Sequence, residues 1–414
     1  MLDRDRVWTG QINESAADPA LQRKIGIYDT TLRDGEQTVG VALGPEVKLE
    51  IARALDRLGI RRIEAGFPRV SADDYHAFEL ILDAGLDAEI WGFARAVPAD
   101  VDQLIGLGLG ASVIEAPVSD GKLAAYGLTR DEVTQRVRDA ISHAAENGIR
   151  VCFFGVDGSR AEPDFLEEIY LTAVNAGAAE IAVVDTLGIA APVAVGGLIE
   201  RARDWVGSEV PIHWHGHDDF GLATAGSIEA VRAGADWIQG TINGMGERAG
   251  NTDLAEFAIA IEAIYGADTS LRLEHISDVA ETVRRLSGYE LAPWKPVTGR
   301  NLFIRESGAV AAQFHDPIAI EPYSSTLVGA RRGLVLGKKS GLASIKIKTD
   351  ELGLDVPEDL HAGLLEQVKT RAISNQGLVA DEEFAEMVAA LAFAVPSKGD
   401  APLGLEATEP PQGL

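Results

Sequence analysis

The feature that most constrains the fold is an eightfold alternation of short β-rich runs with segments of helical spacing. The helical segments carry boundary residues, as in TRDEVTQRVRDAISHAAENG, where Thr129 is expected to cap the start and Gly148 the end. Eight such pairs within roughly 240 residues predict an α/β chain that closes into a (β/α)₈ TIM barrel, although a doubly wound open sheet shares the local pattern. The β-rich runs start at Lys24, Arg62, Glu89, Ser112, Arg150, Glu180, Pro211 and Trp237.

Regions outside the barrel differ from it in pattern. We expect a polar extension over residues 1–21, the barrel over 22–270, helical linker and lid subdomains over 271–395 and a disordered tail over 396–414. The stretch DEEFAEMVAALAFAV carries the apolar stripe of a helix in the third region. The barrel is therefore expected to be followed by a small, mainly helical C-terminal lid region.

Charge and hydropathy narrow the classes of partner. The net charge of −27 would repel nucleic acid and anionic membranes. The opening residues are polar, and no run approaches the ~20 apolar residues of a membrane span. The single cysteine, Cys152, excludes an internal disulfide. A cytoplasmic protein that binds neither nucleic acid nor membrane is expected.

The stretch PIHWHGHDDFGLA places three histidines within five residues, in a chain of 414 residues that holds only 8. In an extended strand, His213, His215 and His217 share one face because alternate side chains point the same way. That face is a candidate metal platform. The alternative is an amphipathic strand with structural histidines, because two ligands alone do not make a site.

Other polar residues fall where barrel strands are expected to end, which is where TIM barrels keep their chemistry. Asp34 offers a carboxylate, His215 and His217 offer imidazoles, and Asn251 offers a carbonyl. This mixed set with open positions suits Mg²⁺ or Mn²⁺ better than Zn²⁺. Arg33 would place a fixed cation where negative charge develops on a substrate oxygen. Two further acids, Asp218 and Asp219, are candidates for outer-shell acceptors or for a helix cap.

Three separated motifs, DTTLRDGEQ, HGHDDFGLATA and NGMGERAGN, resemble the metal-dependent DRE-TIM superfamily, and within it the synthases of homocitrate, 2-isopropylmalate and citramalate. The stretches PVSDGKLA and SRAEPDFLEE resemble bacterial homocitrate synthases. The resemblance implies a Claisen condensation of an acyl-CoA, most simply acetyl-CoA, with a 2-oxo acid, in a homodimer that exchanges its lids. By motif position it also implies metal ligands Asp34, His215, His217 and Asn251, a catalytic Arg33, a substrate-side amide at Gln37 and a second-strand glutamate at Glu64.

The chain departs from these synthases after the barrel. RESGAV places Arg305 and Val310 where the family commonly has histidines, and Ile320 stands where it commonly has a tyrosine. Lys339 replaces another common histidine, and Val156 a common glutamate in the fifth strand. Nearby titratable residues are candidate stand-ins for proton transfer, with ordinary surface roles as the alternative: His315, Tyr323 and Lys339.

Two functions from different classes follow. The first is the acyl-CoA synthase, and the second is a metal-dependent carbon–carbon lyase or aldolase on the same barrel. A barrel that has lost its chemistry and binds a partner is disfavoured by the joint presence of Arg33 and the ligand set. The acceptor stays open among 2-oxoglutarate, oxaloacetate, a branched 2-oxo acid and phosphonopyruvate. Candidate substrate contacts are Gln37, Thr186, Arg95 and Arg160, and either arginine has a surface role as its alternative.

Overall fold

The computed structural model describes residues 4–16 and 18–394, and its main feature is a closed barrel of eight parallel strands. Each strand pairs with the next, and β8 pairs with β1 to close the ring. The closed ring confirms the predicted TIM barrel and excludes the open sheet. The strands are β1 (Gly26–Asp29), β2 (Arg62–Glu64), β3 (Glu89–Arg95), β4 (Ala111–Pro117), β5 (Arg150–Val156), β6 (Glu180–Asp185), β7 (Ile212–Gly216) and β8 (Trp237–Gly240).

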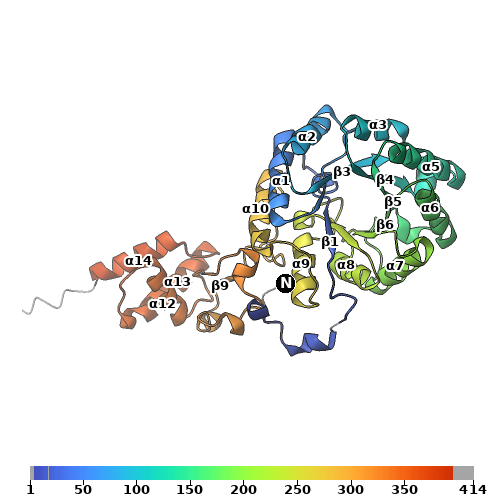
Figure 1. Cartoon of the computed structure of the whole chain (residues 1–414). Helices are drawn as coiled ribbons and strands as arrows, with labels where there is room; N and C mark the ends of the chain where they lie inside the picture. Colours follow the sequence, from blue (N-terminus) through green and yellow to red (C-terminus); the bar gives the residue numbers. More distant parts are fainter. Residues whose placement is uncertain (1–3, 17, 395–414) are drawn as a thin grey trace, which may run out of the picture. The chain divides into compact units, whose positions relative to one another are not determined.

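Helices surround the barrel, as Figure 1 shows. A second helix, α4, precedes α5 between β4 and β5, and α10 packs against α1 beyond the eighth strand. The helices of this part are α1 (Pro45–Leu58), α2 (Ala72–Asp83), α3 (Pro98–Gly106), α4 (Asp120–Tyr126), α5 (Arg130–Glu146), α6 (Pro163–Asn175), α7 (Pro192–Val206), α8 (Ala223–Arg232), α9 (Leu254–Ala263) and α10 (Ile276–Ser287).

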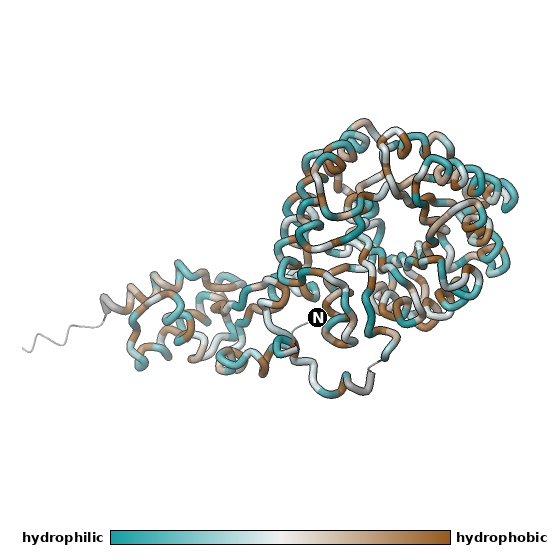
Figure 2. Tube along the Cα trace, in the orientation of Figure 1, coloured by the Kyte–Doolittle hydropathy of each residue, from teal (hydrophilic) through white to brown (hydrophobic). Residues whose placement is uncertain are grey.

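The helix boundaries follow from local side chains. The Thr129 side chain accepts a hydrogen bond from the N–H of Glu132, and the Glu132 side chain accepts one from Thr129 in return, so α5 starts with the predicted cap as a full capping box. Its end is one residue earlier than expected, because Asn147 is the C-cap and Gly148 follows it in the left-handed conformation. Along these helices brown and teal segments alternate in Figure 2, as amphipathic helices require.

The inside of the barrel combines an apolar and a polar part. Inward-facing Phe93, Val113, Phe154 and Val184 belong to one buried apolar cluster. Nearer the N-terminal ends of the strands, His213 and Glu180 are buried, and the partly buried Arg62 pairs with Glu180. The site described below lies at the opposite, C-terminal ends.

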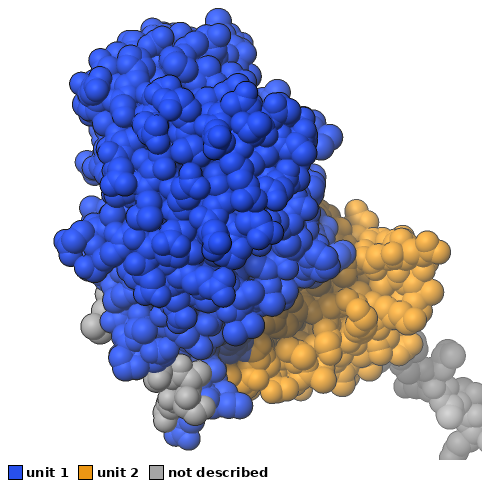
Figure 3. All heavy atoms as spheres, turned by 90° about the vertical axis from the view of Figure 1, so that its right-hand side faces the viewer, with its two compact units in different colours: residues 1–303, 321–331 blue, residues 304–320, 332–414 orange. Residues whose placement is uncertain are grey.

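The chain forms two compact units, coloured separately in Figure 3: Met1–Phe303 with Glu321–Arg331, and Ile304–Ile320 with Arg332–Leu414. The second unit contains a two-stranded sheet and four α-helices among its described residues, around a core that includes Leu336, Leu364 and Phe384. Its elements are β9 (Ile304–Arg305), α11 (Gly308–Ala311), β10 (Gly333–Leu334), α12 (Leu342–Leu352), α13 (His361–Asn375) and α14 (Asp381–Ala394).

The predicted boundaries at residues 21, 270 and 395 stay predictions. The tail expected over 396–414 lies outside the described residues. Within the described part of the chain, no helix is long and apolar enough to span a bilayer.

Candidate metal centre and active site

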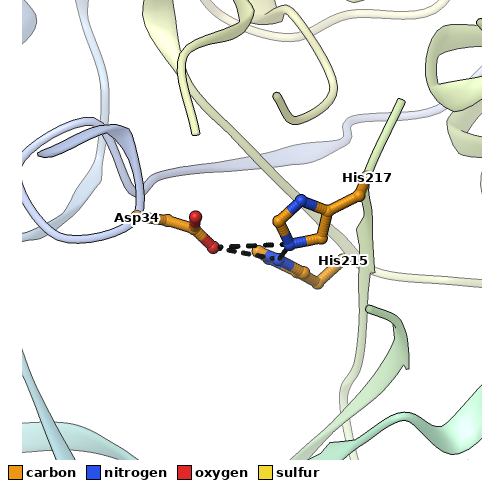
Figure 4. Close-up of side chains that lie close together, drawn as sticks. All are labelled: Asp34, His215 and His217. Atoms are coloured by element: carbon orange, nitrogen blue, oxygen red, sulfur yellow. Dashed lines mark hydrogen bonds and ion pairs between the residues drawn. The ribbon is translucent and has the colours of Figure 1, made fainter. Parts of the chain in front are cut away.

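Asp34, His215 and His217 meet at the C-terminal end of the barrel, as Figure 4 shows. The Oδ2 atom of Asp34 lies 3.3 Å from Nε2 of His215 and 3.7 Å from Nε2 of His217. The two Nε2 atoms are 3.4 Å apart. All three residues are buried, with 2%, 1% and 6% of their surface exposed. The structure thus brings together three of the four side chains that the sequence predicts as ligands, from segments 181 residues apart in sequence (215 − 34).

Backbone geometry holds each of these side chains in place. The carbonyl of Thr30 accepts hydrogen bonds from the N–H groups of Arg33, Asp34 and Gly35, at 3.1, 2.8 and 3.1 Å, which fixes a tight turn after β1. The two histidines follow the inward alternation of β7. Beyond the strand, His217 forms an isolated β-bridge with Asn251, which brings the predicted fourth ligand to the same rim.

The donor atoms fit a divalent cation. Oδ1 of Asp34 and Oδ1 of Asn251 are buried and have no hydrogen-bond partner within the described residues. A buried carboxylate or amide oxygen left in this state is costly unless a ligand satisfies it. The amide nitrogen of Asn251 donates to the carbonyl of Met245 at 3.0 Å, so its oxygen is the end left free. Oxygen and imidazole donors of this kind suit Mg²⁺, Mn²⁺ or Zn²⁺.

Gly246 leaves the space that these atoms occupy. Its φ of +156° favours glycine, and a Cβ atom built there would lie 2.2 Å from Nδ2 of Asn251 and 3.3 Å from Oδ1 of Asp34. The loop after β8 therefore approaches the centre so closely that it admits only a residue without a side chain.

Arg33 lies beside the three ligands. Its Nη1 donates to Oδ2 of Asp34 at 3.0 Å, and its Nε donates to Glu64. Glu64 also accepts a 2.7 Å hydrogen bond from Tyr28, so its carboxylate is held by two donors. Burial opposes the charge on Asp34, but the Arg33 cation and the two histidines outweigh it and hold the pKa of Asp34 well below its usual range.

One end of the Arg33 guanidinium stays free. Nη2 is buried and has no hydrogen-bond partner in the described part of the chain. Burial opposes the charge of this guanidinium, but Glu64 and Asp34 outweigh it and raise the pKa of Arg33. A permanent cation therefore keeps an unused NH₂ group beside the metal ligands.

The predicted substrate contacts have other partners in the structure. Arg95 makes a bidentate pair with Asp100, at 2.7 and 3.1 Å, and Arg160 pairs with Asp157 at 2.6 Å. Thr186 accepts a hydrogen bond from the N–H of Asp157 at 2.8 Å. Gln37 is exposed in a short 3₁₀ helix, η3 (Gly35–Gln37), and lines a cavity next to Arg33.

The two acids that follow the histidines stabilise loops. Asp218 accepts a hydrogen bond from the N–H of Ala223, the first residue of α8, at 2.9 Å. Asp219 pairs with Arg248 at 2.8 Å. Asp218 thus contacts the start of α8, whose N-cap residue is Leu222. Nδ1 of His217 has no hydrogen-bond partner within the described residues, so the two roles of these acids stay predictions.

Two buried polar residues on the N-terminal side of the ligands, Gln239 and Glu180, are not among those that the sequence predicts for the site. Gln239, on β8, lies between His215 and His213, and His213 in turn contacts Glu180. Burial raises the pKa of Glu180, but hydrogen bonds from His213 and Arg62 outweigh it and lower this pKa to about 2. The signal available in the sequence was a polar residue at an inward-facing position of a barrel strand.

Of the candidate stand-ins for proton transfer, Tyr323 is buried and packs edge-on against Phe303, with ring centres 5.9 Å apart. Burial raises the pKa of Tyr323 to about 12. His315 is exposed, and Lys339 pairs with Glu306 at 3.5 Å, both within the second compact unit. Their roles stay predictions.

Known proteins resemble this chain at both the sequence and the fold level. The homocitrate synthase AksA of Methanopyrus kandleri is 39% identical over 360 residues, which cover 86% of this chain and 90% of that protein. The 2-isopropylmalate synthase of Methanocaldococcus jannaschii is also 39% identical over 360 residues, covering 86% of this chain and 69% of its own. These relatives are named synthases, which confirms the predicted class of enzyme at family level.

A solved structure shares the fold at much lower identity. The HMG-CoA lyase of Brucella melitensis has a TM-score of 0.58 and 19% identity, and the match covers 64% of this chain and 100% of that one. The family described as HMGL-like matches residues 24–283. From this match and the identities above, the chain belongs to the HMGL-like (DRE-TIM) family, together with homocitrate and isopropylmalate synthases.

Proposed function

We propose that this protein catalyses a divalent-metal-dependent Claisen condensation of an acyl-CoA, most simply acetyl-CoA, with a 2-oxo acid. The observation that carries the proposal is the buried Asp34, His215 and His217 cluster beside an arginine with one unused donor. The relatives named homocitrate and 2-isopropylmalate synthase support the reaction type.

Asp34, His215, His217 and Asn251 would hold the ion. When bound, a divalent ion supplies Lewis-acid polarisation and orientation to a 2-oxo acid. Mg²⁺ or Mn²⁺ suits the mixed oxygen and imidazole set, and Zn²⁺ is the alternative.

Arg33 is the residue for which charge development matters most. When a carbon nucleophile attacks a ketone, negative charge grows on the ketone oxygen, and a fixed donor aimed at that oxygen lowers the barrier. We propose that the free Nη2 of Arg33 is this donor. Glu64 holds the other side of the guanidinium, so we propose that Glu64 orients Arg33 in the reaction.

The cavity beside Arg33 is the proposed binding site for the side chain of the 2-oxo acid acceptor. It has a volume of about 340 Å³ and apolar walls from Val41, Phe67, Val70 and Phe93. Its two acids, Glu36 and Asp74, each lie 2.6 Å from the buried ammonium of Lys48, so this ammonium is already paired. Arg33, the cation of the lining, is the residue proposed to contact the ketone oxygen. These walls favour a 2-oxo acid with an apolar side chain over a diacid.

The predicted polar contacts to the substrate differ in whether their side chains are already paired. Gln37 lines this cavity and is proposed to donate to the acceptor. Thr186 lies outside this lining and is proposed as a second polar contact. Arg95 and Arg160 would have to exchange Asp100 and Asp157 for a distal anion of the substrate. A distal carboxylate is therefore expected to bind weakly.

A homodimer is the proposed assembly. Val39, Val70 and Phe220 lie in the loops after β1, β2 and β7 and are 95%, 68% and 70% exposed. Exposed apolar side chains on several loops of one rim favour contact with a second copy of the chain. Light scattering coupled to size-exclusion chromatography distinguishes a dimer from a monomer.

The second candidate is a metal-dependent carbon–carbon lyase. The HMG-CoA lyase of Brucella melitensis shares the fold at 19% identity, which supports the fold alone, so the lyase is kept as the alternative to be tested. The two candidates differ in the direction of carbon–carbon bond chemistry and in the release of free thiol.

A thiol-release assay separates them. The protein is incubated with acetyl-CoA, Mg²⁺ or Mn²⁺, and separately with pyruvate, 2-oxoisovalerate, 2-oxoglutarate, oxaloacetate and phosphonopyruvate. We expect thiol release that requires both the metal and an acceptor, with the apolar acceptors preferred. Absence of release with every acceptor, together with cleavage of a 3-hydroxyacyl-CoA, would establish the lyase instead.

A further inference from the structure

A continuous chain of polar side chains crosses the inside of the barrel and ends on the metal ligand His215. Arg62 donates to both carboxylate oxygens of Glu180, at 2.7 and 3.1 Å. Glu180 lies 2.5 Å from Nε2 of His213. The amide of Gln239 then connects Nδ1 of His213 with Nδ1 of His215, at 3.1 Å to each.

The far end of this chain has a fixed charge. Arg62 is held between two indole rings, with its guanidinium carbon 3.6 Å from the Trp237 ring centre and 4.7 Å from that of Trp91. Its carboxylate partner Glu180 is 3% exposed. A guanidinium only donates hydrogen bonds and an ionised carboxylate only accepts them. The direction of the hydrogen bonds from Arg62 to Glu180 is therefore fixed.

The Arg62–Glu180 pair determines the direction of the other hydrogen bonds in the polar chain. Nε2 of His213 faces the Glu180 carboxylate, so it carries the proton. The NH₂ group of Gln239 lies 3.1 Å from Nδ1 of His213, which is therefore the acceptor. The Gln239 oxygen then faces His215, whose Nδ1 must be the protonated nitrogen.

The consequence reaches the metal centre. With the proton on Nδ1, Nε2 of His215 keeps its lone pair, and Nε2 is the atom that lies 3.3 Å from Asp34 and 3.4 Å from His217. A reversed Gln239 amide would place a donor at Nδ1 and favour the tautomer that carries its proton on Nε2, which cannot bind a cation.

We propose that Gln239 and His213 are positioning residues that set the tautomer of His215 and thereby the affinity of the centre for a divalent cation. The inference rests on the metal site of the proposed function and is independent of the acceptor and of the acyl-CoA. Hydrogen bonds of this kind to ligating histidines typically change metal affinity by about 10- to 100-fold.

The test is Mn²⁺ binding to the full-length protein without substrates, measured from the free-ion signal in electron paramagnetic resonance. Gln239→Met keeps the length of the side chain but removes its oxygen and its NH₂ group, and we expect affinity to fall by about 10- to 100-fold. Gln239→Glu keeps an acceptor for His215, and we expect affinity equal to or above that of the wild type. His213→Phe keeps a ring beside Trp237 but lets the amide reverse, and we expect an intermediate loss.

Tyr170→Phe is the matched control. The Tyr170 hydroxyl is buried and donates to the carbonyl of Ala182 at 3.0 Å, outside the polar chain. A purely structural role for Gln239 predicts the same result for Gln239→Met as for Tyr170→Phe: a lower melting temperature with unchanged Mn²⁺ affinity. That result would overturn the proposal.

The other outcomes are also decisive. Unchanged affinity in His213→Phe would limit the effect to Gln239 and refute the chain beyond it. Loss of affinity in Gln239→Glu equal to that in Gln239→Met would refute the role of the acceptor. If the wild type binds no Mn²⁺, the proposed metal site is wrong. If it binds Mn²⁺ normally but releases no thiol, only the proposed reaction is wrong.

Discussion

The guanidinium carbon of Arg33 lies 4.3 Å from the centre of the Phe93 ring, so the cation rests on an aromatic face while its ends pair with Glu64 and Asp34. Stacking and pairing together fix the plane of the guanidinium. A fixed plane determines the direction of the free Nη2 donor. Lysine could keep the charge at this position but not the planar fork.

Arg33→Lys should therefore reduce turnover by about 10²–10³-fold, the usual effect of losing one donor to a developing oxyanion. Mn²⁺ binding should stay within a few-fold of wild type, since Asp34 and both histidines remain. Arg203→Lys is the control, because Arg203 pairs with Asp236 away from the centre. Steady-state kinetics and Mn²⁺ titration are compared for both variants. Near-normal turnover in Arg33→Lys would contradict the role of the fork.

The double substitution His215→Ala/His217→Ala should remove the bound metal. Two of the four proposed ligands are lost, and Asp34 and Asn251 without the imidazoles are too few donors to hold a divalent ion in a buried site. Elemental analysis of purified protein measures metal per chain, and circular dichroism checks that the barrel persists. The control is His76→Ala/His143→Ala, which removes two histidines whose side chains are 52% and 37% exposed. Equal metal content in both doubles would show that the ion binds elsewhere.

Gly246→Ala should weaken metal binding without touching any ligand. The added Cβ would overlap the amide of Asn251 and press on Asp34, in a backbone conformation that side chains rarely adopt. We expect at least a tenfold loss of Mn²⁺ affinity, by analogy with the effect of displaced ligand supports. Gly197→Ala in α7 is the matched control, because a Cβ there meets nothing within 4 Å. Titration with Mn²⁺ measures the affinity of both variants. Equal affinities would show that the loop after β8 shifts to accommodate the added methyl group.

Glu115 should make stability depend on pH. Burial raises the pKa of Glu115 from its ordinary 4.5 to about 7. The folded state therefore holds this proton more tightly than the unfolded state, so its contribution to the free energy of unfolding is full below pH 4.5 and is lost as the pH rises to about 7. Glu115→Gln should remove that dependence and gain stability over the wild type between pH 5 and pH 8.

Urea unfolding of the metal-free protein at several pH values measures this difference. Glu146→Gln, an exposed position on α5, serves as the control and should follow the wild type. Parallel curves for Glu115→Gln and the wild type would show that the Glu115 carboxyl is not the titrating group.

The sequence predicts the barrel and its ligands because both depend on local periodicity. The predicted starts of the eight strands lie within two residues of the observed ones. His215 and His217 share a face through simple alternation, and Asp34 follows from the turn after the first strand. These features need only the spacing within one segment.

The contacts between strands could not be predicted in the same way. Gln239 contacts His215 because β7 and β8 pair with His215 opposite Gln239, a register that the sequence of neither strand reveals. The pairing of Arg95 with Asp100 and of Arg160 with Asp157 depends on how each rim loop turns back. Candidate anion contacts were therefore the part of the site where the structure changed the interpretation most.

The pairing of β1 with β8 has a consequence for folding. Asp34 follows β1, whereas both histidines lie at the end of β7 and Asn251 follows β8, so the ligand set spans nearly the whole barrel sequence. Contacts of such large sequence separation form late, since they require closure of a long loop of chain. During refolding the cation would find its ligands together only after the ring has closed. The rate of metal uptake during refolding would therefore report the rate of the last step of barrel assembly. Stopped-flow mixing with Mn²⁺ measures this rate.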